Sequence, residues 1–92
     1  MRERQFSKGY LAVVHGVPQP PAGQLRDLLG RDSVRRVTFV ADTPSAETRE
    51  ALLDYETLDS SGSLSLVQVH LHTGRTHQIR VQFASRGMPL WG

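Results

Sequence analysis

The stretch of sequence that decides the fold reads Thr73-Gly74-Arg75-Thr76-His77-Gln78-Ile79-Arg80. It opens the one segment with a clear helical pattern, which we predict to run from about Thr76 to Arg86. Thr76 is an N-cap type of residue, because its hydroxyl can accept an orphan N–H of the first turn. At the far end, Gly87 can adopt positive φ, and Pro89 stops the helix from continuing.

A helical wheel at about 100° per residue sorts these side chains into two faces. The apolar face holds Ile79, Val81, Phe83 and Ala84, and the polar face holds Gln78, Gln82, Ser85 and Arg86. Arg80 lies at the centre of the apolar face, with His77 near its edge. A buried guanidinium is expensive unless it meets a carboxylate or several acceptors, so the pattern predicts a partner for Arg80 under the helix. A structural ion pair, or an arginine whose head reaches solvent, fits the same pattern.

Length and composition limit the kinds of protein to which this chain can belong. With 92 residues, the chain is one small domain or a piece of one. It contains no cysteine, which excludes disulfides and thiolate metal sites and suits a reducing compartment. No apolar run approaches the length of a membrane span, and the N-terminus is too charged for a signal peptide. We therefore expect a soluble, cytoplasmic protein without a membrane partner.

Charge is distributed unevenly although the net charge is only +2. Residues 42–59 carry six acidic side chains against Arg49, whereas residues 60–92 carry three arginines, three histidines and no acid. A basic end beside an acidic middle suits a polyanionic partner such as nucleic acid. Chance segregation of charge, which is common in small domains, explains the pattern equally well.

Alternating apolar and polar residues predict strands over most of the remaining chain. The predicted strands cover Lys8 to His15, Gln24 to Leu29, Ser33 to Ala41, Ala51 to Leu58 and Ser63 to His72. The second is ambiguous, because its leucines also have helical spacing. The last is the clearest, with Ser65, Val67, Val69 and Leu71 on one half-buried face. The expected fold class is α+β, an antiparallel meander of four or five strands followed by one helix.

The sequence lacks several motifs that are common in enzymes. The sequence has no phosphate-cradling glycine loop, no cysteine nucleophile and no Gly-x-Ser-x-Gly. His70 and His72 share a strand face, and with His77 they could be imagined as metal ligands. No carboxylate lies nearby in the sequence, and strand histidines are mostly polar surface residues, so we expect no metal site.

The segment from Thr73 to Val81, followed by Ala84, Gly87 and Pro89, resembles the C-terminal signature of the RluA-type family of RNA pseudouridine synthases. The segment from Lys8 to Ala12 is similar to the Lys-x-Tyr-x-Ala strand of that family. Gly23 with Leu25, and Ala51 with Tyr55 and Leu58, fall where the family has its middle strands. The resemblance covers nearly the whole chain in order and spacing, and implies a piece of the pseudouridine synthase catalytic fold.

The resemblance also implies an activity, the isomerisation of uridine to pseudouridine in rRNA or tRNA, without metal or cofactor. An aspartate attacks, the uracil rotates, and it is rejoined through carbon. The implied catalytic residues are Tyr10, whose ring stacks on the base, and Arg80, which pairs with that aspartate. Ile79 corresponds to a packing residue beneath the base. The implied RNA contacts come from Lys8, Arg75, His77 and Arg86, together with Ile79.

Two departures from the family pattern bear on activity. The catalytic aspartate belongs to a His-Arg-Leu-Asp motif that the family places before the Lys-x-Tyr strand, and this motif does not occur among the 92 residues. The chain also stops where the family continues. We therefore expect residues 1–92 to be a partial catalytic domain, truncated at both ends, inactive alone, with the missing flanking segments as its partners. A stand-alone or vestigial RNA-binding module without catalysis is the alternative.

Overall fold

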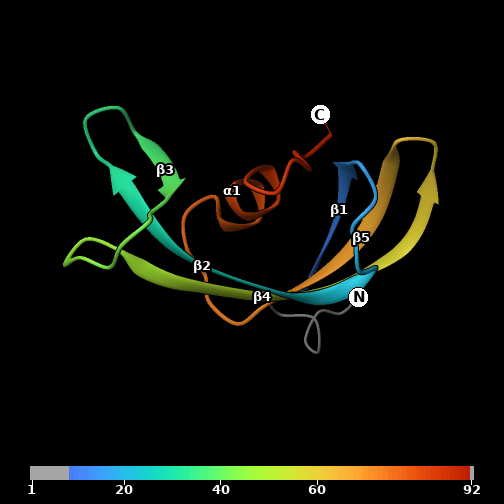
Figure 1. Ribbon diagram of the computed structural model, residues 1–92, viewed down its shortest axis with the longest axis horizontal. Helices are drawn as coiled ribbons and strands as arrows, with labels where there is room; N and C mark the ends of the chain where they lie inside the picture. Colours follow the sequence, from blue (N-terminus) through green and yellow to red (C-terminus); the bar gives the residue numbers. More distant parts are fainter. Residues whose placement is uncertain (1–8, 92) are drawn as a thin grey trace.

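The computed structural model describes residues 9–91 and contains one curved sheet and one helix (Figure 1). The strands are β1 (Gly9–His15), β2 (Ala22–Asp32), β3 (Val37–Val40), β4 (Arg49–Ser61) and β5 (Leu64–Leu71), and the helix is α1 (Gln78–Ala84). The sheet curls upward at both ends, and α1 lies on its concave side (Figure 1). The expected α+β class, an antiparallel sheet with one helix, is confirmed.

The order of strands across the sheet differs from a simple meander. It runs β1-β5-β4-β2-β3, and every neighbouring pair is antiparallel. The hairpins β2–β3 and β4–β5 are local, as a meander requires. However, the first strand pairs with the last, and β4 pairs with β2 on the side opposite β3. Two hairpins side by side therefore bring β1 next to the strand that leads into α1.

The strands follow the predicted ones, with three changes in length. β4 has 13 residues and extends beyond both predicted ends, and β2 has 11 residues and runs through both glycines that were expected to bracket it. Gly30 allows a close approach, because a Cβ there would meet the Phe39 ring at 2.7 Å, whereas one on Gly23 would make ordinary contact with the Tyr55 ring at 3.4 Å. β3 is shorter than expected, since Asp32 accepts backbone hydrogen bonds in a turn that occupies the preceding residues.

The core lies between the concave face of the sheet and α1. β5 contributes alternate residues, as predicted, and Tyr55 meets the ring of Phe83 edge to face at 5.8 Å between centroids. The buried cluster consists of Val14, Leu25, Leu53, Tyr55, Val67, Val69, Leu71 and Phe83. Ile79, Met88 and Leu90 pack against this cluster. No helix among residues 9–91 is long and apolar enough to cross a bilayer.

The helix differs from the predicted one in length and in the face it buries. It starts at Gln78 rather than Thr76, because His77 takes a left-handed conformation with φ of 54° and makes no side-chain cap. It buries Gln78, Gln82 and Phe83, whereas Arg80 is exposed. The predicted burial of Arg80 in the centre of an apolar face is therefore wrong. The helix also ends at Ala84 rather than Arg86, although Gly87 has the predicted positive φ, at 78°.

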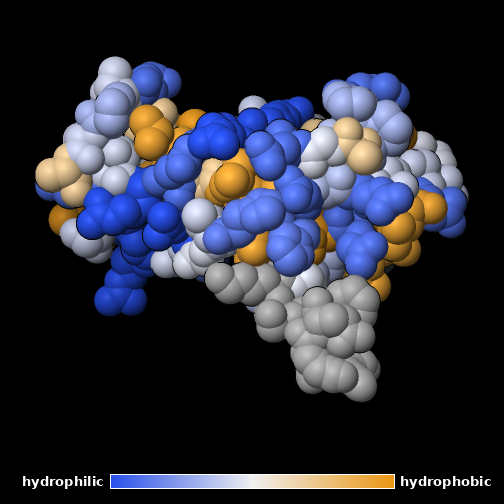
Figure 2. Space-filling view, turned by 90° about the horizontal axis from the view of Figure 1, so that it is seen from below, coloured by the Kyte–Doolittle hydropathy of each residue, from blue (hydrophilic) through white to orange (hydrophobic). Residues whose placement is uncertain are grey.

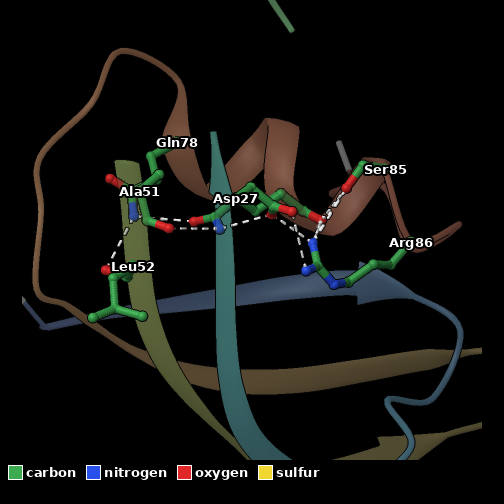
Figure 3. A network of polar contacts seen from close by, with 7 residues as sticks. Asp27, Ala51, Leu52, Gln78, Ser85 and Arg86 are labelled. Carbon is green, nitrogen blue, oxygen red and sulfur yellow. Dashed lines mark hydrogen bonds and ion pairs between the residues drawn. The ribbon is translucent and has the colours of Figure 1, made fainter. Parts of the chain in front are cut away.

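A chain of polar contacts explains why the buried face of α1 includes Gln78 and Gln82 beside Phe83 (Figure 3). The Gln78 side-chain amide donates to Gln82 at 3.0 Å, and the Gln82 amide donates to the Asp27 carboxylate at 2.9 Å and to the Ala51 carbonyl at 3.3 Å. Arg86 closes the chain by donating to both oxygens of Asp27 at 2.7 and 3.3 Å. Because these groups satisfy one another, glutamines occupy positions that hydropathy assigns to apolar residues.

The loop before α1 is held against β4 by the same glutamine. The Gln78 side-chain oxygen accepts from the Thr73 hydroxyl at 2.9 Å and from the Arg75 backbone N–H at 3.0 Å. Thr73 in turn accepts from the Leu52 N–H at 3.0 Å, and the Gln78 amide donates to the Leu52 carbonyl at 3.2 Å. Thr73 and Gln78 therefore tie the loop, and with it the start of α1, to the middle of the sheet.

The convex face of the sheet is mainly polar in its middle (Figure 2). Hydrophilic side chains cover much of its middle, with smaller apolar patches between them. Asp54 lies opposite both Gln24 and His70, and bonds to Gln24 at 3.0 Å and to His72 at 2.7 Å. The hydrogen bond with His72, followed by that with Gln24, lowers the pKa of Asp54 below its ordinary value.

Removal of the buried Gln82 amide should destabilise the fold. In Gln82→Leu, the Ala51 carbonyl and the Gln78 amide lose a partner, and a buried unsatisfied group costs about 1–3 kcal/mol. The matched control is Gln24→Leu on the exposed face, which should stay within about 0.5 kcal/mol. Denaturant unfolding of both variants tests this, and equal losses would refute the role of the network.

The pair of Asp54 and His72 should be visible in a titration. Because its folded pKa is lowered, Asp54 stabilises the fold above its ordinary pKa, and this contribution disappears as pH falls through the folded pKa. His72→Gln should move the pKa of Asp54 back up, whereas His15→Gln on exposed β1 should not. NMR titration of the Asp54 carboxyl carbon measures both, and an unchanged pKa in His72→Gln would contradict the assignment.

Candidate functional site

Tyr10, the residue expected to stack on the base, lies near the start of β1 on the concave face. It is opposite Val69, which is fully buried, and directly opposite residues of an antiparallel pair share a face. Val69 is in turn opposite Tyr55 on β4. Tyr10, Val69 and Tyr55 therefore form a row of side chains across the concave face, toward β2. The Tyr10 side chain is nevertheless 49% exposed, because β1 is at the edge of the sheet. Its ring is therefore available to a ligand.

Arg80 is exposed on the side of α1 that faces solvent. Within residues 9–91 its guanidinium forms no ion pair and no hydrogen bond. The glutamine network explains this position, because it turns the opposite side of the helix toward the sheet. Arg80 therefore reaches solvent, which was one of the two alternatives to a buried partner. Arg80 thus remains free to pair with an anion from elsewhere.

The other residues of the signature are divided between packing and the surface. Ile79 is half-buried and packs against the core cluster, next to Arg80 in the chain. His77 is exposed at the turn into α1. Arg75 is half-buried, and its Nε donates to the Glu50 carbonyl at 2.8 Å. Lys8 lies outside the described residues.

Arg86, expected to contact RNA, is engaged within the protein. Besides both oxygens of Asp27, its Nη1 donates to the Gln82 carbonyl at 3.0 Å and to the Ser85 hydroxyl at 3.3 Å (Figure 3). The exposed fractions of the two side chains are 32% for Arg86 and 13% for Asp27. This geometry gives Arg86 a positioning role for α1, and its contact with RNA stays a prediction.

The three histidines near the signature do not converge. His70 and His72 stack edge to face at 5.1 Å between ring centroids, and His72 is bound to Asp54. His77 belongs to α1 on the other side of the sheet. Among residues 9–91, no group of three or more His, Cys, Asp or Glu side chains is arranged to hold a metal ion.

Sequence reasoning missed the residues that place the site. Gln78, Gln82 and Asp27 determine which side of α1 is exposed, yet all three were read as surface residues or left unassigned. One signal was present: two glutamines at i and i+4 share a helix face and can bond to each other. Their acceptor on β2 was not visible, because it is 55 residues away in the chain.

A pocket of about 630 Å³ lies beside this network but apart from Tyr10 and Arg80. The loop between β1 and β2 covers it, and its lining includes Gly23, Tyr55, Arg86 and Met88. Tyr55 holds that loop by donating from its hydroxyl to the Pro20 carbonyl at 2.6 Å. Neither expected catalytic side chain lines this pocket, so the pocket gives no support to a site at Tyr10 and Arg80.

The sequence is similar to known proteins of one family. The sequence profile of RNA pseudouridylate synthase matches residues 1–85. A protein of Chlorobaculum parvum named as an uncharacterized RNA pseudouridine synthase is 41% identical over 91 residues, covering 97% of this chain and 28% of its own length. RNA pseudouridine synthase 2, chloroplastic, of Arabidopsis thaliana is 36% identical and covers 90% of this chain and 20% of its own.

Solved structures agree with the sequence relatives. Human RNA Pseudouridylate Synthase Domain Containing 4 superposes with a TM-score of 0.76 at 26% identity, over 92% of this chain and 36% of that one. Human RNA Pseudouridylate Synthase Domain Containing 1 gives 0.78 at 26% identity, over 90% and 37%. The chain spans less than a third of the length of the Chlorobaculum relative. The profile match and the shared fold show that this chain belongs to the RNA pseudouridylate synthase family.

Proposed function

We propose that the chain is the part of an RluA-type catalytic domain that holds the target base and orients the nucleophile. The reaction is the isomerisation of uridine to pseudouridine in rRNA or tRNA. The observation that carries the proposal is the pair of exposed side chains on the concave side, Tyr10 on β1 and Arg80 on α1, at the positions where the family motifs have their catalytic residues.

Each side chain suits its proposed role. The half-exposed Tyr10 ring offers a stacking surface to a flipped uracil, an interaction that contributes about 1–3 kcal/mol per base. The Arg80 guanidinium can form a bidentate pair with a carboxylate and so keep that carboxylate ionised and oriented. Ile79, anchored in the core, supports the underside of the base. The chemistry requires no metal or cofactor in this proposal.

The nucleophilic aspartate comes from a flanking segment in this proposal. Asp27 and Asp54 are bound to Gln82 and His72, and Asp32 accepts hydrogen bonds in the β2–β3 turn. Asp42 and Asp59 lie at positions that do not match the His-Arg-Leu-Asp motif. The residues of the chain therefore prepare a site whose carboxylate is supplied by the rest of the catalytic domain. We also propose a cytoplasmic location, since a cysteine-free sequence suits a reducing compartment.

The 92-residue chain alone should show no synthase activity, because nucleophilic catalysis cannot be supplied by positioning residues. The assay is tritium release from RNA that contains 5-tritiated uridine. The control is the longer protein encoded with an upstream His-Arg-Leu-Asp, which should release tritium. Turnover by the chain alone would contradict the proposed roles, and inactivity of the longer protein would favour a binding module without catalysis.

Substitution of Arg80 should separate stability from activity. Arg80→Met in the 92-residue chain should change the free energy of unfolding by less than about 0.5 kcal/mol, because the side chain is exposed and unpaired among the described residues. In the longer protein, the same change should abolish single-turnover activity, because the aspartate loses its cation. Arg35→Met, which removes another exposed charge at a distance from the proposed site, is the control for both. A loss of several kcal/mol in the chain would reveal an internal partner.

A further inference from the structure

A small basic pocket lies where the β2–β3 hairpin rises beside the loop before α1. It has a volume of about 230 Å³, which equals roughly eight water molecules at about 30 Å³ each. Its polar lining consists of Arg31, Thr38, Glu47, Arg49, Arg75 and Thr76. Because Arg31, Arg49 and Arg75 meet there, we call it the three-arginine pocket.

Three separate segments bring these arginines together. Arg31 is on β2, two residues after the buried Leu29 and four after Asp27, so it shares the concave face with the acceptor of α1. Arg49 begins β4 directly opposite Leu29. Arg75 comes from the loop that Thr73 and Gln78 fix to the sheet. The pocket therefore depends on the fold rather than on a run of basic residues.

Carbonyl and hydroxyl oxygens hold these guanidinium groups. Arg31 donates to the Thr38 hydroxyl at 3.1 Å, and Arg75 donates to the Glu50 carbonyl at 2.8 Å. Arg49 donates to the carbonyls of Ala46 and Thr48, each at 2.9 Å. Such neutral acceptors orient a guanidinium without cancelling its charge, so the remaining N–H donors keep their affinity for an anion.

The charge balance of the pocket favours an anionic ligand. Among residues 9–91, none of these three arginines forms an ion pair with a carboxylate, whereas Arg26 is paired with Glu50 and Arg86 with Asp27. Glu47 also lines the pocket and is exposed, so it lowers the positive charge without removing it. Several guanidinium forks around one small volume match the geometry of a phosphate group.

We propose that the three-arginine pocket binds a backbone phosphate of the substrate RNA, at a nucleotide that flanks the target uridine. The proposal rests on the proposed function of the chain in RNA modification. β3 and β1 lie on opposite sides of α1 (Figure 1). The row that contains Tyr10 meets β4 at Tyr55, and Arg49 lies six residues away along β4, or about 20 Å at about 3.3 Å per residue, so a base on Tyr10 cannot place its own phosphate here. The pocket would thus fix the path of the RNA strand at some distance from the reacting nucleotide.

RNA binding by charge variants tests the proposal. Arg31→Gln and Arg49→Gln should each weaken binding and reduce the slope of log affinity against log salt by about 0.7–0.9, the value of one phosphate contact. Arg35→Gln is the matched control, since Arg35 is on the same hairpin, outside the pocket, and should leave the slope unchanged. Glu47→Gln should tighten binding. Arg75 is left intact because it also holds its loop.

An NMR experiment distinguishes binding in the three-arginine pocket from RNA binding elsewhere on the protein. Inorganic phosphate, and then a structured RNA, should shift the Nε–Hε signals of Arg31, Arg49 and Arg75 but not that of Arg35. RNA binding with equal effects of Arg35→Gln and the pocket variants would refute the pocket and leave the proposed function standing. Shifts with phosphate but none with RNA would overturn the assignment to RNA and indicate a site for free phosphate. Failure of the unmodified protein to bind RNA would contradict the proposed function itself.

Discussion

The hydrogen bond from Gln82 to Asp27 is the contact on which the rest of the site depends. α1 has seven residues and no side-chain cap at its start, so it is too short to be stable in isolation. Its position is set by mutually satisfied polar groups, which run from the buried Gln78 and Gln82 to the partly buried Asp27 and the exposed Arg86. A polar network of this kind specifies one orientation, because rotation of the helix would leave several buried groups without partners.

Some arginines among residues 9–91 are paired with carboxylates, and others are not. Arg86 and Arg26 are neutralised by carboxylates and belong to the scaffold. Arg80 is turned outward by the helix, and the arginines of the three-arginine pocket are held by neutral oxygens. The concave side therefore carries arginines that have no carboxylate partner among residues 9–91, while on the convex side His72 is bonded to Asp54. In the proposed function, this positive charge would attract the RNA backbone to the concave side of the sheet.

The sequence allowed the strands, the fold class and the family to be predicted, since each rests on local pattern or on a contiguous motif. Alternation in β5 correctly identified its buried face, and Gly87 has the predicted positive φ although the helix ends earlier, at Ala84. The helix face was wrong because hydropathy ranks glutamine as a surface residue and ignores a partner 55 residues earlier. The pairing of β1 with β5 and the pocket around Arg31 and Arg49 depend on long-range register, which no local pattern encodes.

The pairing of β2 with β4 has a consequence for the loop before α1. α1 is held to Asp27 on β2, and the loop is held to Leu52 on β4, so the position of both depends on the pairing of these two strands. Contacts of this kind join residues far apart in the chain and are stabilised only when the intervening segment is closed. The local stability of the loop therefore follows that of the sheet. A substitution that weakens the pairing of β2 with β4 would loosen the loop even where the substituted residue does not contact it.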